Sequence, residues 1–179
     1  MADWNTAYNW MMDNEDAPRA CKQVPDAPPT GFTGTCYAIS GINSAVFAAE
    51  FSTIAAVDQS QRAPLVQQFY QKHFWNNWYA QVNSDDVCKR VFDFAVNGGS
   101  GASVKCLQEA VNSLAPAGAP QLKEDGGWGP MTLAAVNAVD GAALLAAFKA
   151  KRAAYYQAVV AANPAKAQYL NAWLARAGK

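Results

Sequence analysis

The stretch VFDFAVNGG at residues 91–99 lies where one amphipathic helix is expected to end and the next to begin. Asp85 or Asp86 can cap a helix that runs to about Val96, and the glycine-rich residues 97–101 then break it. Beyond the break, apolar side chains recur at helical spacing and predict a further helix: Val104, Leu107, Val111 and Leu114. The alternation of helix, break and helix continues in both directions from this stretch.

Upstream, residues 64–78 carry the apolar stripe of another helix. The first helix is predicted over residues 3–15. Four of its side chains share one face: Trp4, Tyr8, Met11 and Glu15. Between these two helices, residues 16–36 are interrupted by prolines and glycines. We interpret this segment as a rigid binding loop, with at most a small hairpin within residues 16–40.

Downstream, Pro130 follows a glycine-rich turn and suits the first position of a helix. The last two helices are predicted over residues 141–162 and 164–175. The sequence therefore predicts a mainly α-helical protein. We expect two tightly associated lobes, residues 1–90 and residues 91–179, because the length of 179 residues suits two small units that share an interface.

The composition indicates a packed globular protein, because 51% of the residues are hydrophobic and 16% are charged. Fourteen basic residues balance fourteen acidic ones, so there is no electrostatic reason to expect nucleic-acid binding. No apolar segment is long enough to span a bilayer, and we expect no membrane insertion. The N-terminal residues lack the basic start and apolar core of a signal peptide.

The cysteines and the single histidine lack the spacing of a metal site, so we expect neither a metal nor a cofactor. An even number of cysteines favours two disulfides, Cys21–Cys36 and Cys88–Cys106, each of which could add about 3 kcal/mol. Such bonds would imply action outside the cytoplasm. Four cysteines allow three pairings, and free buried thiols are the alternative.

Glu15 ends the first predicted helix on its apolar face, where its carboxyl group is expected to be partly desolvated. The negative end of the helix dipole and the nearby Asp13 and Asp16 act in the same direction, because each disfavours a further negative charge. Glycosidases need a carboxylic acid that stays protonated near neutral pH. Glu15 therefore fits a general acid, although a solvated glutamate at a helix end is the simpler alternative.

Several segments resemble phage-type N-acetylmuramidases of glycoside hydrolase family 108. Residues 12–15 (MDNE) end the first helix as the family's acid-bearing motif does. Residues 35–40 (TCYAIS) are similar to its Thr-x-x-Gly-Ile stretch, and residues 69–75 (FYQKHFW) to its Tyr-x-x-x-Tyr-Trp helix. Residues 91–99 match its Phe-Asp-x-Ala-Val-Asn-x-Gly signature. The resemblance implies a lysozyme-like helical fold whose catalytic lobe is residues 1–90.

The second half resembles the peptidoglycan-binding domain that follows this catalytic domain. The matching segments occur in the family's order: residues 107–110 (LQEA), 125–132 (DGGWGPMT), 152–156 (RAAYY) and 173–176 (WLAR). The resemblance implies that residues 91–179 form a helical peptidoglycan-binding lobe that completes the cleft.

The resemblance implies hydrolysis of the β-1,4 bond between N-acetylmuramic acid and N-acetylglucosamine. Glu15 would protonate the leaving oxygen, Asp26 would stabilise the transition state or activate water, and Thr35 would hold that water. The expected substrate-binding residues are Tyr37, Trp75, Asn97 and Trp128. Aromatic faces suit the apolar faces of sugars, but the same rings also suit core packing.

Three further expectations concern polar residues outside this set. His73 falls on an apolar stripe, so we expect a packed or hydrogen-bonded side chain rather than a ligand. Asp93 or Asn97 is expected to bond the backbone and fix the cleft wall. Arg152 and Arg176 suit either glycan or peptide carboxylates or salt bridges.

Two other functions remain open: a lytic transglycosylase that uses the same acid, and a non-catalytic cell-wall binding protein. The replacement of two family glycines by Asp16 and Ala17 motivates the second. The expected partners are peptidoglycan glycan strands, a holin or secretion apparatus for export, and an inhibitor or immunity protein. We expect an endolysin or secreted antibacterial effector, made in the cytoplasm and acting on the wall in the periplasm or outside the cell.

Overall fold

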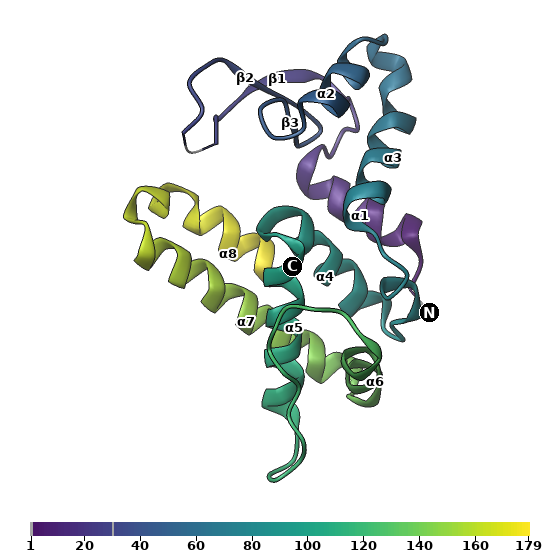
Figure 1. Ribbon diagram of the computed structural model, residues 1–179, viewed down its shortest axis with the longest axis vertical. Coiled ribbons are helices and arrows are strands. Elements are labelled where there is room, and N and C mark those ends of the chain that lie inside the picture. The colour runs from purple at the N-terminus through teal and green to yellow at the C-terminus, as the bar shows by residue number, and fades with distance from the viewer. Residues whose placement is uncertain (1, 30) are drawn as a thin grey trace. The chain divides into compact units, whose positions relative to one another are not determined.

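The computed structural model describes residues 2–29 and 31–179 and confirms a mainly α-helical fold (Figure 1). The chain divides into a smaller unit, Tyr8–Trp75, and a larger unit formed by the residues up to Ala7 together with Asn76–Lys179. The division near residue 75 differs from the expected lobe boundary at residue 90. That boundary would cut helix α4 (Asp85–Gly98), whose backbone is continuous there.

The smaller unit combines helices with a small antiparallel sheet. Its helices are α1 (Trp4–Glu15), which begins in the larger unit, α2 (Ala48–Ala55) and α3 (Arg62–Phe74), with a short 3-10 turn η1 (Gln59–Gln61). Its strands lie in the order β1 (Gln23–Asp26), β2 (Cys36–Ile39) and β3 (Ile42–Asn43). Both strand pairs are antiparallel. The pairing of β1 with β2 confirms a small hairpin within residues 16–40.

The core of the smaller unit is built from apolar side chains of α1, α3 and the sheet. Met11, Ile39 and Ile42 are fully buried. The rings of Tyr8 on α1 and Tyr70 on α3 lie 6.3 Å apart. Full burial of a large apolar side chain contributes about 2 kcal/mol, so this core fixes the end of α1 relative to the sheet.

The connection between β2 and β3 is a two-residue turn formed by Ser40 and Gly41. Both residues have positive φ angles, 48° and 81°. Two consecutive left-handed residues are typical of a type I′ turn, whose twist matches that of the strands it joins. The turn therefore closes the β2–β3 hairpin tightly and gives Ser40 a backbone conformation that is uncommon for residues other than glycine.

The larger unit is built from five α-helices within the described residues. They are α4, α5 (Ser100–Leu114), α6 (Pro130–Ala138), α7 (Gly141–Ala162) and α8 (Leu170–Gly178), with 3-10 turns η2 (Tyr79–Gln81) and η3 (Pro164–Tyr169). Helix α7 packs against α4, α5 and α8. The final predicted helix at residues 164–175 is thus a 3-10 turn followed by an α-helix.

The helix ends in this unit follow local chemistry. The N-cap of α4 is Ser84, whose hydroxyl accepts a hydrogen bond from Val87 N. The expected cap at Asp85 or Asp86 was therefore wrong by one or two residues. Gly99 separates α4 from α5 with a φ of 94°, a conformation that glycine adopts readily. Pro130 occupies the start of α6 as predicted.

A charged cluster lies in the interior of the larger unit. Asp93 on α4 is fully buried and pairs with Arg152 on α7 and Arg176 on α8, each through a nitrogen 2.8 Å from a carboxylate oxygen. Arg152 also lies over the Phe94 ring, 4.9 Å from its centroid. Of the two roles expected for these arginines, the structure shows salt bridges, which join three helices around one buried carboxylate.

The predicted disulfides are wrong, because all four cysteines are free thiols. Cys36 pairs with Asp26 in the register of β1 and β2, five residues beyond Cys21, which corresponds to roughly 15 Å of extended chain. A disulfide requires Cα atoms within about 7 Å. Cys88 and Cys106 direct their thiols to different neighbours, the carbonyl oxygens of Tyr79 and Lys151.

Among the described residues, no single helix has the length and apolarity needed to cross a membrane; α6 and α7 pass that test only as a sharply bent pair.

Candidate functional site

The carboxylate of Glu15 lies against the turn between β2 and β3. Glu15 is half-buried at the end of α1. A Cβ atom added to Gly41 would lie 2.5 Å from Glu15 Oε2 and 2.8 Å from the Tyr70 hydroxyl oxygen. A side chain at this position would therefore have to displace the end of the Glu15 or Tyr70 side chain, and the positive φ angle of Gly41 also favours glycine. The carboxylate, the turn and Tyr70 therefore form one compact site.

Two side chains hold the turn in place beside Glu15. The Tyr70 hydroxyl donates a hydrogen bond of 2.7 Å to the carbonyl oxygen of Ser40. The Ser40 hydroxyl donates one of 2.7 Å to Asp16 Oδ2. Tyr70 belongs to α3 and Asp16 follows α1, so the turn is tied to both helices. This arrangement preorganises the site, because neither contact depends on a bound ligand.

Asp16 is an ionised neighbour of Glu15. Burial would raise the pKa of Asp16, but hydrogen bonds from Ser40, Cys21 N and Ala20 N, and the charge of Arg19, lower it below its ordinary value. The two backbone donors lie 2.8 and 3.1 Å from the Asp16 carboxylate oxygens. The carboxylate thus carries its charge while it organises the segment that follows α1.

Arg19 counters part of the negative charge at this helix end. Its guanidinium lies 2.9 Å from Asp13 Oδ1 and donates a hydrogen bond of 3.0 Å to the carbonyl oxygen of Asn9. The sequence predicted that Asp13 and Asp16 would add like charge beside Glu15. The structure differs because Arg19 folds back onto α1 and pairs with one of these carboxylates.

The proposed partners of Glu15 lie toward the other end of the sheet. Asp26 ends β1 opposite Cys36, and the exposed Thr35 comes directly before β2. Along β2, Cys36 and Ser40 are four residues apart, which corresponds to roughly 13 Å. Asp26 accepts hydrogen bonds of 2.8 Å from Asn43 Nδ2 and from Ala27 N. Asp26 and Thr35 therefore flank the loop that joins β1 to β2, whereas Glu15 contacts the turn that joins β2 to β3.

Sequence reasoning missed Ser40, Gly41 and Tyr70 as members of the site. Ser40 was noted only as the end of the TCYAIS stretch, and Tyr70 only as part of an apolar stripe. The available signal was the Ser40–Gly41 step between two short apolar segments, because glycine in such a position is typical of a hairpin turn.

The expected substrate-binding residues are divided between the two units. Tyr37 on β2 and Trp75 at the end of α3 belong to the smaller unit, and both are half-buried. In the larger unit, Asn97 is exposed and its Oδ1 accepts a hydrogen bond from the Tyr156 hydroxyl. Trp128 packs edge-to-face on Tyr79, with ring centroids 5.6 Å apart, so it is more enclosed than its glycine-rich turn suggested.

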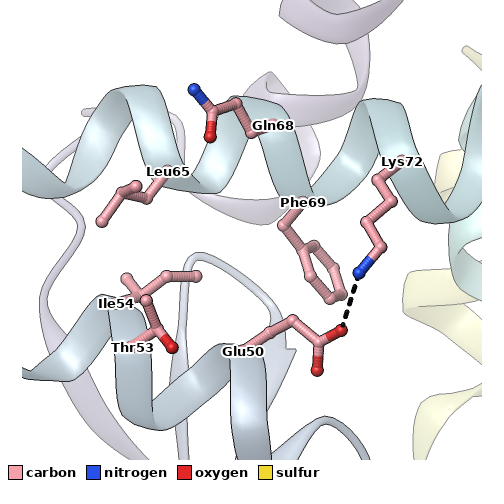
Figure 2. A pocket seen from close by; sticks show the side chains of 7 residues that line it. All are labelled: Glu50, Thr53, Ile54, Leu65, Gln68, Phe69 and Lys72. Atoms are coloured by element: carbon pink, nitrogen blue, oxygen red, sulfur yellow. Dashed lines mark ion pairs between the residues drawn. The ribbon is translucent and has the colours of Figure 1, made fainter.

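A separate pocket of about 170 Å³ lies between α2 and α3 in the smaller unit (Figure 2). Phe69 and Lys72 of α3 reach toward Glu50 of α2, and the Lys72 ammonium lies 3.5 Å from Glu50 Oε1. His73 Nε2 lies 2.9 Å from the same oxygen, and its ring packs beside Phe69. The predicted hydrogen-bonded role of His73 is confirmed. None of the expected catalytic residues lines this pocket.

No group of three or more His, Cys, Asp or Glu side chains within residues 2–29 and 31–179 has the arrangement of a metal site.

Comparisons with known proteins connect the chain to the bacterial cell wall. Residues 102–178 match the protein family described as "Predicted Peptidoglycan domain". The whole chain is similar in fold to SagA of Brucella abortus, with a TM-score of 0.60 and 21% sequence identity over 98% of this chain and 89% of that one. No curated protein matches the chain. The family match supports a peptidoglycan-associated protein, and the likeness to SagA supports the mainly helical fold.

Proposed function

We propose that the protein is a peptidoglycan hydrolase, an N-acetylmuramidase that cleaves the β-1,4 bond between N-acetylmuramic acid and N-acetylglucosamine. One observation carries this proposal: the carboxyl group of Glu15 is held at a helix end against a turn that two other side chains fix. Such a group is suited to general acid catalysis, which needs a positioned proton donor. The peptidoglycan-domain match at residues 102–178 supplies the substrate class.

In this reaction the Glu15 carboxyl group donates its proton to the glycosidic oxygen as the bond to the anomeric carbon breaks. Positive charge develops on the sugar ring, and a water molecule then adds to the anomeric carbon and releases a proton. Asp26 is our candidate for the carboxylate that assists this water, with Thr35 holding it. We do not assign this role to Asp16, because its oxygens already accept hydrogen bonds from the turn and the backbone. Asp16 instead positions the turn beside Glu15.

The proposal assigns catalysis to the N-terminal lobe and wall recognition to the C-terminal lobe. The lobes were predicted as residues 1–90 and 91–179, and the family match at residues 102–178 supports the assignment of the second. Action on the cell wall requires export, for which a holin or a secretion apparatus remains our prediction. An inhibitor or immunity protein would protect the producing cell.

The test compares purified cell walls treated with the wild type, Glu15→Gln and Asp58→Asn. Asp58 is an exposed carboxylate of the smaller unit whose side chain caps nothing, so it is a matched control for loss of one acid. We expect wall clearing by the wild type and Asp58→Asn and none by Glu15→Gln. A wild type that sediments with walls without clearing them would contradict the hydrolase and indicate a binding protein.

A lytic transglycosylase is the second candidate, and one observation favours it. Asp26 lies beside the β1–β2 loop, at the opposite end of β2 from the turn that Glu15 contacts, whereas a transglycosylase needs the acid but no water-activating carboxylate. Mass spectrometry of the released fragments separates the two reactions. Reducing ends are expected from the muramidase, and 1,6-anhydro ends would replace it with the transglycosylase.

A further inference from the structure

The larger unit carries an open groove between α5 and α7, with a volume of about 510 Å³. This volume lies within the usual range for sites that bind small molecules, roughly 300–1,000 Å³. None of the expected catalytic or substrate-binding residues lines the groove. Its charged side chains come from three segments: α5, α7 and the loop before α6.

Two lysines line the groove, one from each of its helices. Lys105 belongs to α5 and Lys151 to α7. The thiol of Cys106, next to Lys105, contacts the Lys151 carbonyl oxygen at 3.9 Å, which places the two lysines at the same level. In the part of the chain that the structure describes, neither ammonium group has a carboxylate within ion-pair distance. Two ammonium groups at one level, neither of them in an ion pair, are suited to take an anionic group.

The electrostatics of Cys106 support the closeness of these charges. Burial is the main cause that raises the pKa of the Cys106 thiol, to about 11. The charge of Glu109 raises it further, while those of Lys151 and Lys105 lower it. All three charged groups therefore act on one buried atom at the base of the groove, and the thiol itself stays protonated at neutral pH.

A fixed carboxylate also lines the groove. Asp125 Oδ1 accepts hydrogen bonds of 2.9 Å from Gly127 N and 3.1 Å from Gln108 Nε2. These bonds lower the pKa of Asp125, so it is ionised and oriented. The loop that bears it rests on α5, because a Cβ atom at Gly126 would lie 2.5 Å from the Gly101 carbonyl oxygen. Its other oxygen, Oδ2, lies 3.8 Å from the Lys123 ammonium in an exposed ion pair that a bound amine would replace. Asp125 thus offers a preset acceptor for a cationic group.

We propose that this groove binds the stem peptide of peptidoglycan, a short peptide that carries both free carboxylates and a free amine. The paired Lys105 and Lys151 take a carboxylate, and Asp125 with Glu109 takes the amine. Ala154 and the half-buried Tyr155 ring supply the apolar surface between them. The inference rests on the proposed function for the identity of the peptide and adds to it the part of the substrate that the C-terminal lobe recognises.

Calorimetric titration of the full-length Glu15→Gln protein tests this binding without cleavage. The probes are a soluble muropeptide, in which the disaccharide carries its stem peptide, and the same disaccharide without the peptide. We expect only the muropeptide to bind at this groove, and the double variant Lys105→Gln/Lys151→Gln to bind it about tenfold more weakly or worse. Lys166→Gln, which removes an exposed lysine elsewhere in the same unit, should bind as the parent does.

A second pair of variants tests the shape of the groove without changing charge. Ala154→Trp fills the groove from an exposed position of α7 and should abolish the peptide-dependent binding. Ala146→Trp, exposed on another face of the same helix, should leave it unchanged.

Three results would overturn the proposal that the groove binds the stem peptide. They are equal affinity for the two probes, unchanged muropeptide affinity in both groove variants, or displacement of the muropeptide by equimolar inorganic phosphate. Wall clearing by the wild type alongside any of these results would reject the groove and keep the hydrolase. Groove-dependent binding of the muropeptide without any wall clearing would keep the groove as a binding site and reject the hydrolase.

Discussion

Glu15 and Gly41 lie in close contact: a Cβ atom at Gly41 would lie 2.5 Å from Glu15 Oε2. The contact joins the end of α1 to the turn between β2 and β3, two segments that are far apart along the chain. It makes the position of the proposed catalytic acid depend on a residue without a side chain. The turn is therefore part of the catalytic apparatus in our account.

Gly41→Ala should abolish most wall-clearing activity, because the new methyl group must displace the Glu15 carboxylate or the Tyr70 hydroxyl. Gly31→Ala is the matched control, since Gly31 also has a positive φ angle, 86°, but has no atom within 4 Å of the added Cβ. Both variants bear similar backbone strain, about 1 kcal/mol. Clearing rates normalised to folded protein should fall only for Gly41→Ala. Equal rates in the two variants would show that the contact does not matter for activity.

Asp16 should make stability depend on pH in the acid range. Its pKa is lower in the folded protein than in the unfolded chain, where it is about 3.9. The ionised form therefore stabilises the fold above that value, and the contribution is lost as the pH falls through the folded-state pKa. Asp16→Asn should lower the urea midpoint of unfolding at pH 7. The midpoint of this variant should also fall less between pH 7 and pH 3 than that of the wild type. A decline as steep as that of the wild type would reject this role, and Asp58→Asn serves as the exposed control.

The helices were predictable from the sequence because their signals are local. Apolar periodicity and the glycine break at Gly99 located α4 and α5, and Pro130 marked the start of α6. The turn at Ser40 and Gly41 was missed because its role depends on Tyr70 and Asp16, which approach it only in the folded chain. Even cysteine numbers suggested disulfides, but the strand register that separates Cys21 from Cys36 is also a property of the fold.

Asp93→Asn should destabilise the larger unit by about 3–5 kcal/mol, because it leaves the buried Arg152 without its counter-charge. The contact of Arg152 with the Phe94 ring cannot replace an ion pair in the interior. Asp86→Asn is the comparison, since Asp86 pairs with Lys89 and Arg90 at the surface and should cost at most about 1 kcal/mol. Urea denaturation of both variants gives the two values, and similar small losses would mean that the Asp93 cluster is solvated.

Reducing agents should leave both thermal stability and wall clearing unchanged, because the four cysteines are free thiols. Burial raises the pKa of Cys88 to about 12 and that of Cys106 to about 11, so these thiols should react slowly with a thiol reagent in the folded protein. Titration with such a reagent in denaturant should count four thiols without prior reduction. A count of two or fewer would restore the disulfides.

The central claim, that Glu15 is the acid of a glycosidase, is tested most directly by the rate at which new reducing ends appear in purified peptidoglycan. General acid catalysis typically contributes 10²- to 10⁴-fold, so Glu15→Gln should be slower than the wild type by about that factor. Asp58→Asn should match the wild type. Reducing ends released by Glu15→Gln at the wild-type rate would contradict the account.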